Sequence, residues 1–228
     1  MAQKPSRTRT KNNVLSRLAS ADFALLKPHL VALDLPVLTQ LETAYSRIEA
    51  VYFLESGFAS VVADGAGKRS IEVGIIGREG MTGLSLVLGG DRSPHATYIQ
   101  VAGTGQRISA SKLRLAMDQS VGLHRSLLRC AHAFLIQTTQ TAVANGRSKN
   151  EERLARWLLM AADRIDGHEL PLAHKFLAIM LGVHRPAVTV ALQALERRGF
   201  IRAGREVIAI TDRTGLVRMS NGAYLPPE

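Results

Sequence analysis

Four polar side chains lie close together near the C-terminal end of the chain, and their types suit the recognition of DNA bases. They are His184, Arg185, Thr189 and Gln193, and none of them is acidic. An arginine can donate two hydrogen bonds to guanine in the major groove, and a glutamine can bond adenine there. The chemistry that they indicate is the reading of base edges, which requires a helix that presents them outward.

The surrounding residues predict such a helix and another before it. Apolar residues recur at helical spacing from Leu172 to Leu181 and again from about Arg185 to Arg198. Gly182 follows the first helix, at a position where a left-handed turn commonly ends helices. Pro186 falls in the first turn of the second helix, where a missing N–H costs nothing. Two short helices joined by a glycine-containing corner form a helix-turn-helix.

Two short apolar runs follow this helix pair, from Phe200 to Ala203 and from Glu206 to Ile210. Gly204 and Arg205 lie between them, as in a tight hairpin. A helix-turn-helix with a hairpin is a winged helix, and its second helix would enter the major groove. Other basic side chains of the segment would then contact phosphates. We expect this role for His174, Lys175, Arg197 and Arg205.

The charge of the chain agrees with a polyanionic partner. Its 228 residues have a formal net charge of +10, and residues 1–13 contain four basic side chains and no acidic one. Residues 146–228 contain 13 basic and 9 acidic side chains, a net charge of +4, while the middle is close to neutral. A basic end beside a near-neutral body is typical of a DNA-binding module attached to another domain.

Composition and motifs also exclude several classes of protein. The single cysteine, Cys130, rules out an intrachain disulfide framework and an iron–sulfur cluster held by several cysteines. No apolar run reaches the roughly 18 residues of a membrane helix, and no apolar segment follows the basic N-terminus as in a signal peptide. The chain has no HExxH, GxSxG or P-loop motif. We therefore expect a cytoplasmic protein that is not an enzyme and does not enter a membrane.

The hydrophobic pattern divides the chain into four parts. We expect a disordered basic tail over residues 1–13 and a β-roll with flanking helices over residues 14–120, where short apolar runs alternate with glycine and aspartate turns. A long helix follows over residues 121–145, and the winged helix-turn-helix occupies residues 146–228. The predicted fold is therefore α+β.

The long helix contains a stripe of residues at alternating intervals of three and four, as in the seam of a coiled coil. Because a helix-turn-helix protein gains affinity by binding two half-sites, we interpret this stripe as the contact in a parallel homodimer. The alternative is that the stripe packs on the chain's own β-roll. The predicted seam consists of Leu123, Leu127, Cys130, Phe134, Gln137 and Thr141.

Three segments give the sequence a resemblance to a known family: VYFLESGFASV, DGAGKRSIEVGIIGREGMTG and LGVHRPAVTVALQALERRGFIRAGREVIAITD. From about Val14 to Leu216 the chain resembles the cyclic-AMP receptor protein / fumarate-nitrate regulator (Crp/Fnr) family. The resemblance implies a dimeric transcription regulator in which an effector in the β-roll reorients two recognition helices. The implied partners are double-stranded DNA, a second copy of the chain and RNA polymerase. Arg185 matches the base-reading arginine of the family, but Pro186 replaces the usual glutamate, so we expect a different operator.

The resemblance also suggests where an effector would bind, although it leaves the effector unidentified. A cyclic nucleotide is one candidate, because family members hold its phosphate with a Gly-Glu and an Arg-Ser pair and touch its base from the long helix. The iron–sulfur branch of the family is excluded by the single cysteine, and for a haem the candidate ligands are His29, His95, His124 and His132. The residues that match the cyclic-nucleotide positions are Gly77, Glu79, Gly80, Arg92, Ser93, Thr138 and Thr139.

A second function class remains open at this point. The chain could be a sensor of a nucleotide or small metabolite whose winged helix binds a protein instead of DNA. The two classes differ in their response to salt, because DNA binding releases counterions and weakens steeply as salt is added.

Overall fold

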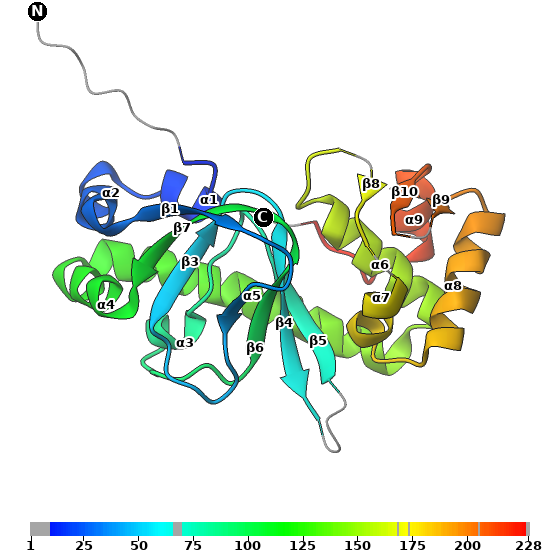
Figure 1. Ribbon diagram of the computed structural model, residues 1–228, viewed down its shortest axis with the longest axis horizontal. Helices are drawn as coiled ribbons and strands as arrows, with labels where there is room; N and C mark the ends of the chain where they lie inside the picture. Colours follow the sequence, from blue (N-terminus) through cyan, green and yellow to red (C-terminus); the bar gives the residue numbers. More distant parts are fainter. Residues whose placement is uncertain (1–9, 66–69, 168, 173, 205, 227–228) are drawn as a thin grey trace, which may run out of the picture.

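The computed structural model describes residues 10–65, 70–167, 169–172, 174–204 and 206–226, and for residues 174 and 175 it describes the backbone without the side chains. Figure 1 shows a β-roll with small helices at one end of the molecule and a largely helical unit at the other. The long helix α5 (Val121–Arg147) extends along both parts. The predicted α+β fold with a β-roll, a long helix and a C-terminal helix-turn-helix is confirmed.

The β-roll consists of two antiparallel sheets with strand orders β1-β7-β3 and β2-β6-β4-β5. Strands β3 and β4 are buried along most of their length, which explains their nearly continuous apolar sequences. Between them Gly57 has φ +66°, and a Cβ there would lie 2.3 Å from the carbonyl oxygen of Val101. The strands are β1 (Val31–Leu35), β2 (Gln40–Glu42), β3 (Ala50–Leu54), β4 (Phe58–Asp64), β5 (Ser70–Ile76), β6 (Ala96–Val101) and β7 (Gly103–Ser109).

Short helices cover the ends of the roll. They are α1 (Asn13–Ser16), α2 (Ser20–Leu26), the 3-10 helix η1 (Lys27–His29), α3 (Leu84–Val87) and α4 (Ala110–Gln119). The buried Asn12 side chain caps α1 by accepting the Leu15 N–H at 3.1 Å, and its amide donates to the carbonyls of Leu54 and Gly80 at 2.9 Å each. One capping side chain thus fixes the first helix to the roll.

Helix α5 is two residues longer than predicted and continues through Gly146 to Arg147. The predicted seam is wrong, because its side chains contact the chain's own body. Leu123 and Leu127 are fully buried in the core of the roll, and Cys130 and Phe134 pack beside them against roll residues. The Gln137 amide bonds β5, and the Thr141 hydroxyl accepts a hydrogen bond from Arg156 at 3.1 Å.

The C-terminal unit is a winged helix-turn-helix. Its helices are α6 (Asn150–Ala162), α7 (His174–Leu181), α8 (Arg185–Arg197) and α9 (Arg213–Met219), and its sheet has the order β8-β10-β9. At the corner between α7 and α8, Gly182 has φ +59° and would place a Cβ 2.6 Å from Cδ1 of Ile71. The strands are β8 (Glu169–Leu170), which was not predicted, and β9 (Ile201–Ala203) and β10 (Ile208–Ile210), which are shorter than the two predicted runs.

The two ends of the molecule share one hydrophobic core. Phe58, Ile75 and Val101 of the roll pack with the buried faces of α6, α7 and α8. The rings of Phe58 and Trp157 meet edge to face with centroids 6.2 Å apart. The helix-turn-helix is therefore fixed against β4 and β5 by apolar packing.

Candidate DNA-binding face and effector cavities

Helix α8 has one buried and one exposed face. Val188, Ala191, Leu192 and Leu195 form its buried stripe, as the spacing predicts. His184 occupies the N-cap position, and the side chains of His184, Arg185, Thr189 and Gln193 are all exposed. The four candidate base-reading residues thus lie together near the start of one exposed helix face, in the arrangement that insertion into a major groove requires.

The candidate phosphate contacts are only partly described. Arg197 is exposed in the last turn of α8. His174 and Lys175 begin α7, but their side chains are outside the described part of the structure, and so is Arg205. The exposed Arg198 and Arg202 lie beside this face in sequence and were not among the predicted contacts.

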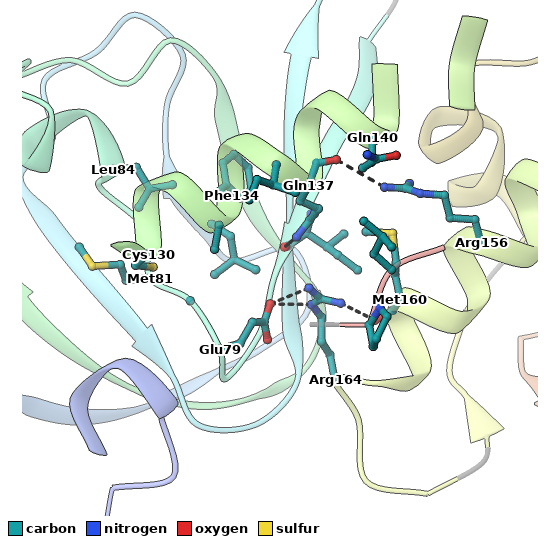
Figure 2. Close-up of a pocket in the computed structure, with 17 residues that line it drawn as sticks. Glu79, Met81, Leu84, Cys130, Phe134, Gln137, Gln140, Arg156, Met160 and Arg164 are labelled. Carbon is teal, nitrogen blue, oxygen red and sulfur yellow. Dashed lines mark hydrogen bonds and ion pairs between the residues drawn. The ribbon is translucent and has the colours of Figure 1, made fainter. Parts of the chain in front are cut away.

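A cavity of about 360 Å³ lies where β5 and the loop after it meet α5 and α6; we name it the α5–α6 cavity (Figure 2). Most of its lining side chains are apolar, including Ile75, Met81, Phe134 and Met160. Its charged lining residues are Glu79, Arg156 and Arg164. The cavity therefore touches the β-roll, the long helix and the first helix of the winged helix-turn-helix unit.

Glu79 and Arg164 form a buried ion pair at one side of this cavity. Two guanidinium nitrogens of Arg164 lie 2.7 and 2.8 Å from Oε1 of Glu79, and the third donates to the Met160 carbonyl at 2.7 Å. Figure 2 shows these two side chains pointing toward each other from the loop after β5 and from the end of α6. Glu79 also accepts the Gly77 N–H at 3.1 Å. Its carboxylate is thus used within the protein.

Arg156 points from α6 toward α5 and has only neutral acceptors. Its guanidinium donates to the carbonyls of Ala223 at 3.0 Å and Gln137 at 3.4 Å and to the Thr141 hydroxyl at 3.1 Å. The residue is only 6% exposed. Burial lowers the pKa of Arg156 to about 10, and the nearby Glu72 opposes this shift. Within the described part of the chain, no carboxylate lies within ion-pair distance of it.

Gln137 joins α5 to β5 by a pair of backbone contacts. Its side-chain oxygen accepts the Ile75 N–H at 2.7 Å, and its amide nitrogen donates to the Ile75 carbonyl at 3.1 Å. A Cβ on Gly74 would lie 2.8 Å from both Gln137 and Phe134, so this approach requires glycine. The polar second half of the predicted seam is therefore explained by contacts within the chain, of Gln137 with β5 and of Thr141 with Arg156 of α6.

Glu72 is a buried acid between β5 and α6. Its two oxygens accept hydrogen bonds from the Ser60 hydroxyl at 2.5 Å and from the Trp157 indole at 2.6 Å. Burial raises the pKa of Glu72 to about 8, although these hydrogen bonds and the charges of Arg156 and Arg164 act in the opposite direction. The acid is consequently protonated at neutral pH.

A second cavity, of about 430 Å³, lies between the roll and the middle of α5; we name it the roll cavity. Glu42 lies on its wall, where its carboxylate accepts the Gly83 N–H at 3.1 Å and the Thr97 hydroxyl at 2.7 Å. Burial raises the pKa of Glu42, while its hydrogen bonds act to lower it. The Gly83 N–H and the Thr97 hydroxyl are thus already bonded to an internal carboxylate.

The structure does not bring the predicted effector residues into one site. Glu79 and Gly80 line the α5–α6 cavity, whereas Ser93 and Thr138 line the roll cavity. The remaining three, Gly77, Arg92 and Thr139, line neither cavity. The exposed Arg92 donates to the Tyr45 carbonyl at 2.9 Å, and the hydroxyls of Thr138 and Thr139 both donate to the Leu135 carbonyl of their own helix.

Among the described residues, no three His, Cys, Asp or Glu side chains gather in a way that could hold a metal ion. Of the candidate haem ligands, His124 is bonded through Nε2 to the Val87 carbonyl at 2.9 Å. Burial raises the pKa of the Cys130 thiol to about 11, so this side chain is a neutral thiol beside the cavity. No described helix is both long and apolar enough to span a bilayer.

Sequence reasoning missed Arg156, Arg164 and Glu72, which are charged residue types in buried positions. One signal was present, because Arg156 interrupts the apolar run from Leu154 to Ala161 in which every residue is buried. A charged residue inside such a run commonly has a buried role.

Residues 152–219 match the family model of the Crp-like helix-turn-helix domain. None of the curated proteins matches the chain in sequence. The domain predicted from the Gly182 corner and the α8 stripe is thus confirmed by comparison as well as by the structure.

Solved structures extend the likeness to the whole fold. FixK2 from Bradyrhizobium japonicum aligns over 83% of this chain and 96% of its own, with a TM-score of 0.72 and 18% identity. The c-di-GMP responsive global regulator CLP of Xanthomonas campestris aligns over 84% and 99%, with a TM-score of 0.68 and 18% identity. A CRP-family transcriptional regulator from Thermus thermophilus aligns over 85% and 99%, with a TM-score of 0.70 and 19% identity. The resemblance to the Crp/Fnr family is confirmed at the level of fold.

Proposed function

We propose that this chain, which has the fold of the Crp/Fnr transcription regulators, binds double-stranded DNA as a homodimer and regulates transcription in the cytoplasm in response to an effector. The observation that supports it best is the exposed face of α8, with Arg185, Thr189 and Gln193 above a fully buried stripe. Arg185 would donate to guanine, and Gln193 would bond adenine. RNA polymerase is the implied further partner, and we propose no enzymatic activity.

We propose that the two copies meet along the outer stripe of α5, in place of the stripe that packs on the roll. The outer stripe also follows alternating intervals of four and three. Three of its six members, Val121, Leu128 and Leu135, are large exposed apolar residues. Leu135 is 60% exposed and Val121 is 66% exposed. The outer stripe consists of Val121, Arg125, Leu128, His132, Leu135 and Thr139.

The proposal assigns a different role to each of three parts of the described chain. The roll with its helices, up to residue 120, would receive the signal; α5 would join the two copies; and the segment after Ser148 would bind DNA. Two α8 helices held about 34 Å apart would enter successive major grooves of a pseudo-palindromic operator.

Selection from a pool of random duplexes, followed by gel shift across a salt series, tests this proposal. We expect the enrichment of one pseudo-palindromic sequence and a steep loss of affinity for it as salt is added. Arg185→Ala should weaken binding to the selected sequence about tenfold or more and relax the base preference at one position. The exposed Arg17→Ala should change neither.

Binding that is insensitive to salt and selects no sequence would refute the proposal. That outcome would favour the second function class, a small-molecule sensor whose winged helix binds protein.

A further inference from the structure

The α5–α6 cavity has an excess of positive charge. Its charged lining residues are two arginines and one glutamate. Arg164 is neutralised by Glu79 at 2.7 Å, and the Cys130 thiol, whose pKa burial raises to about 11, adds no negative charge. In the lining that the structure describes, one positive charge, that of Arg156, is therefore left over.

Among the residues that the structure describes, none neutralises Arg156. Its three acceptors are two carbonyls and a hydroxyl, all uncharged. Glu72 lies close enough to interact with its charge, but both Glu72 oxygens are bonded to Ser60 and Trp157. Since the pKa of Glu72 is about 8, that acid is neutral at pH 7. A buried cation without a counterion is unfavourable, and an anion that reached it would relieve this cost.

We propose that the α5–α6 cavity binds a small, largely apolar molecule with one carboxylate, whose apolar part lies among the side chains of Ile75, Phe134 and Met160 and whose carboxylate pairs with Arg156. A volume of about 360 Å³ is near the lower end for ligand pockets, which suits a bicyclic aromatic acid or a medium-chain fatty acid. A guanidinium can donate two parallel hydrogen bonds to a carboxylate. If the proposed function holds, this molecule is the class of effector that regulates the protein. Only that regulatory role rests on the proposed function; the binding itself does not.

The position of the cavity gives its ligand a route to the DNA-binding unit. The same molecule would contact β5, α5 and α6. Figure 2 shows Arg156 reaching the cavity from α6 and Arg164 from just beyond the end of α6, while Gln137 reaches it from α5 and Glu79 from the loop after β5. A ligand there would bind most tightly to the arrangement of the three elements seen in this structure, and would thereby stabilise it.

Calorimetric titration of the full chain without DNA tests the proposal with three probes of one shape: 2-naphthoate, its neutral amide and the cationic 2-naphthylmethylamine. We expect 2-naphthoate to bind at least tenfold more tightly than the amide, and the amine to bind more weakly than both. Arg156→Met should abolish the preference for the acid over the amide. The exposed Arg17→Met, outside the cavity, should keep this preference.

Ala133→Phe provides a second variant in case Arg156→Met does not fold. Ala133 is an exposed residue that lines the cavity, so a larger side chain there narrows the cavity without replacing a buried group. We expect this substitution to weaken the binding of 2-naphthoate at least tenfold. Equal binding of acid and amide to the unaltered protein, or full binding by Ala133→Phe, would overturn the proposal.

The outcome is separate from that of the DNA experiment. Binding of 2-naphthoate by a protein that selects no DNA sequence would overturn the proposed function and leave this inference standing. Sequence-specific DNA binding by a protein that does not distinguish acid from amide would do the reverse.

Discussion

Replacing Glu72 by glutamine should change how the stability of the protein depends on pH. The acid has an ordinary pKa of 4.5 and a pKa of about 8 in the folded protein, because burial disfavours its charged form. Between these values the folded state retains a proton that the unfolded state has lost, so stability falls as pH rises. Each pH unit lowers the free energy of unfolding by about 1.4 kcal/mol, which amounts to about 5 kcal/mol over the whole interval.

Glutamine has nearly the shape of the protonated acid and cannot ionise. Glu72→Gln should therefore have nearly the stability of the natural protein near pH 5. At pH 7 it should be more stable by about 3 kcal/mol, because the natural protein loses about 1.4 kcal/mol for each pH unit above 4.5. Urea titrations at several pH values measure this, and the fluorescence of the single tryptophan, Trp157, is a suited probe because its indole donates to Glu72.

A matched control is Glu49→Gln, at an exposed position, whose stability should follow that of the natural protein at every pH. If the profiles of the natural protein and of Glu72→Gln ran parallel between pH 5 and 8, the burial argument would be wrong. The positive charges of Arg156 and Arg164 favour the ionised form of Glu72 and, with its hydrogen bonds to Ser60 and Trp157, limit how far burial raises its pKa.

Three further substitutions test other contacts. Gln137→Ala removes both bonds to the Ile75 backbone and should lower the free energy of unfolding by about 1–3 kcal/mol, measured in urea. Gly182→Ala should cost about 1–2 kcal/mol by calorimetry, because φ is +59° and its Cβ would meet Ile71. Leu135→Glu should give a monomer in analytical ultracentrifugation with unchanged helix content, and a dimer that survived it would contradict the outer stripe as the contact.

The helix-turn-helix could be predicted from sequence because its signals are local. Pro186 in a first turn and the stripe of α8 each depend on residues within a few positions of one another. The exact strand ends could not be predicted in the same way, since β9 and β10 are only as long as their pairing with each other and with β8 allows.

The buried charges could not be predicted because they depend on distant parts of the chain. Glu72 is 85 positions from Trp157 in sequence, and Glu79 is 85 positions from Arg164. Nothing in the local pattern around Arg156 indicates that Glu72 would be too buried to ionise and so leave it without a counterion. The effector residues were predicted by motif, and the motif carried no information on the carboxylate of Glu42, which bonds the Gly83 N–H and Thr97 hydroxyl.

Helix α5 shows why a single stripe was a misleading signal. A helix that lies between its own domain and a second copy needs two apolar faces, and both then show the same alternation of three and four. What distinguishes the faces is the partner of the polar member: Gln137 bonds a strand, whereas Thr139 bonds only its own helix. Because the inner face is bonded to β5 by Gln137 and to α6 by Thr141 and Arg156, α5 cannot rotate at the outer face without disturbing those bonds. In the proposed dimer, the contact between copies and the position of the helix-turn-helix would therefore be coupled through α5.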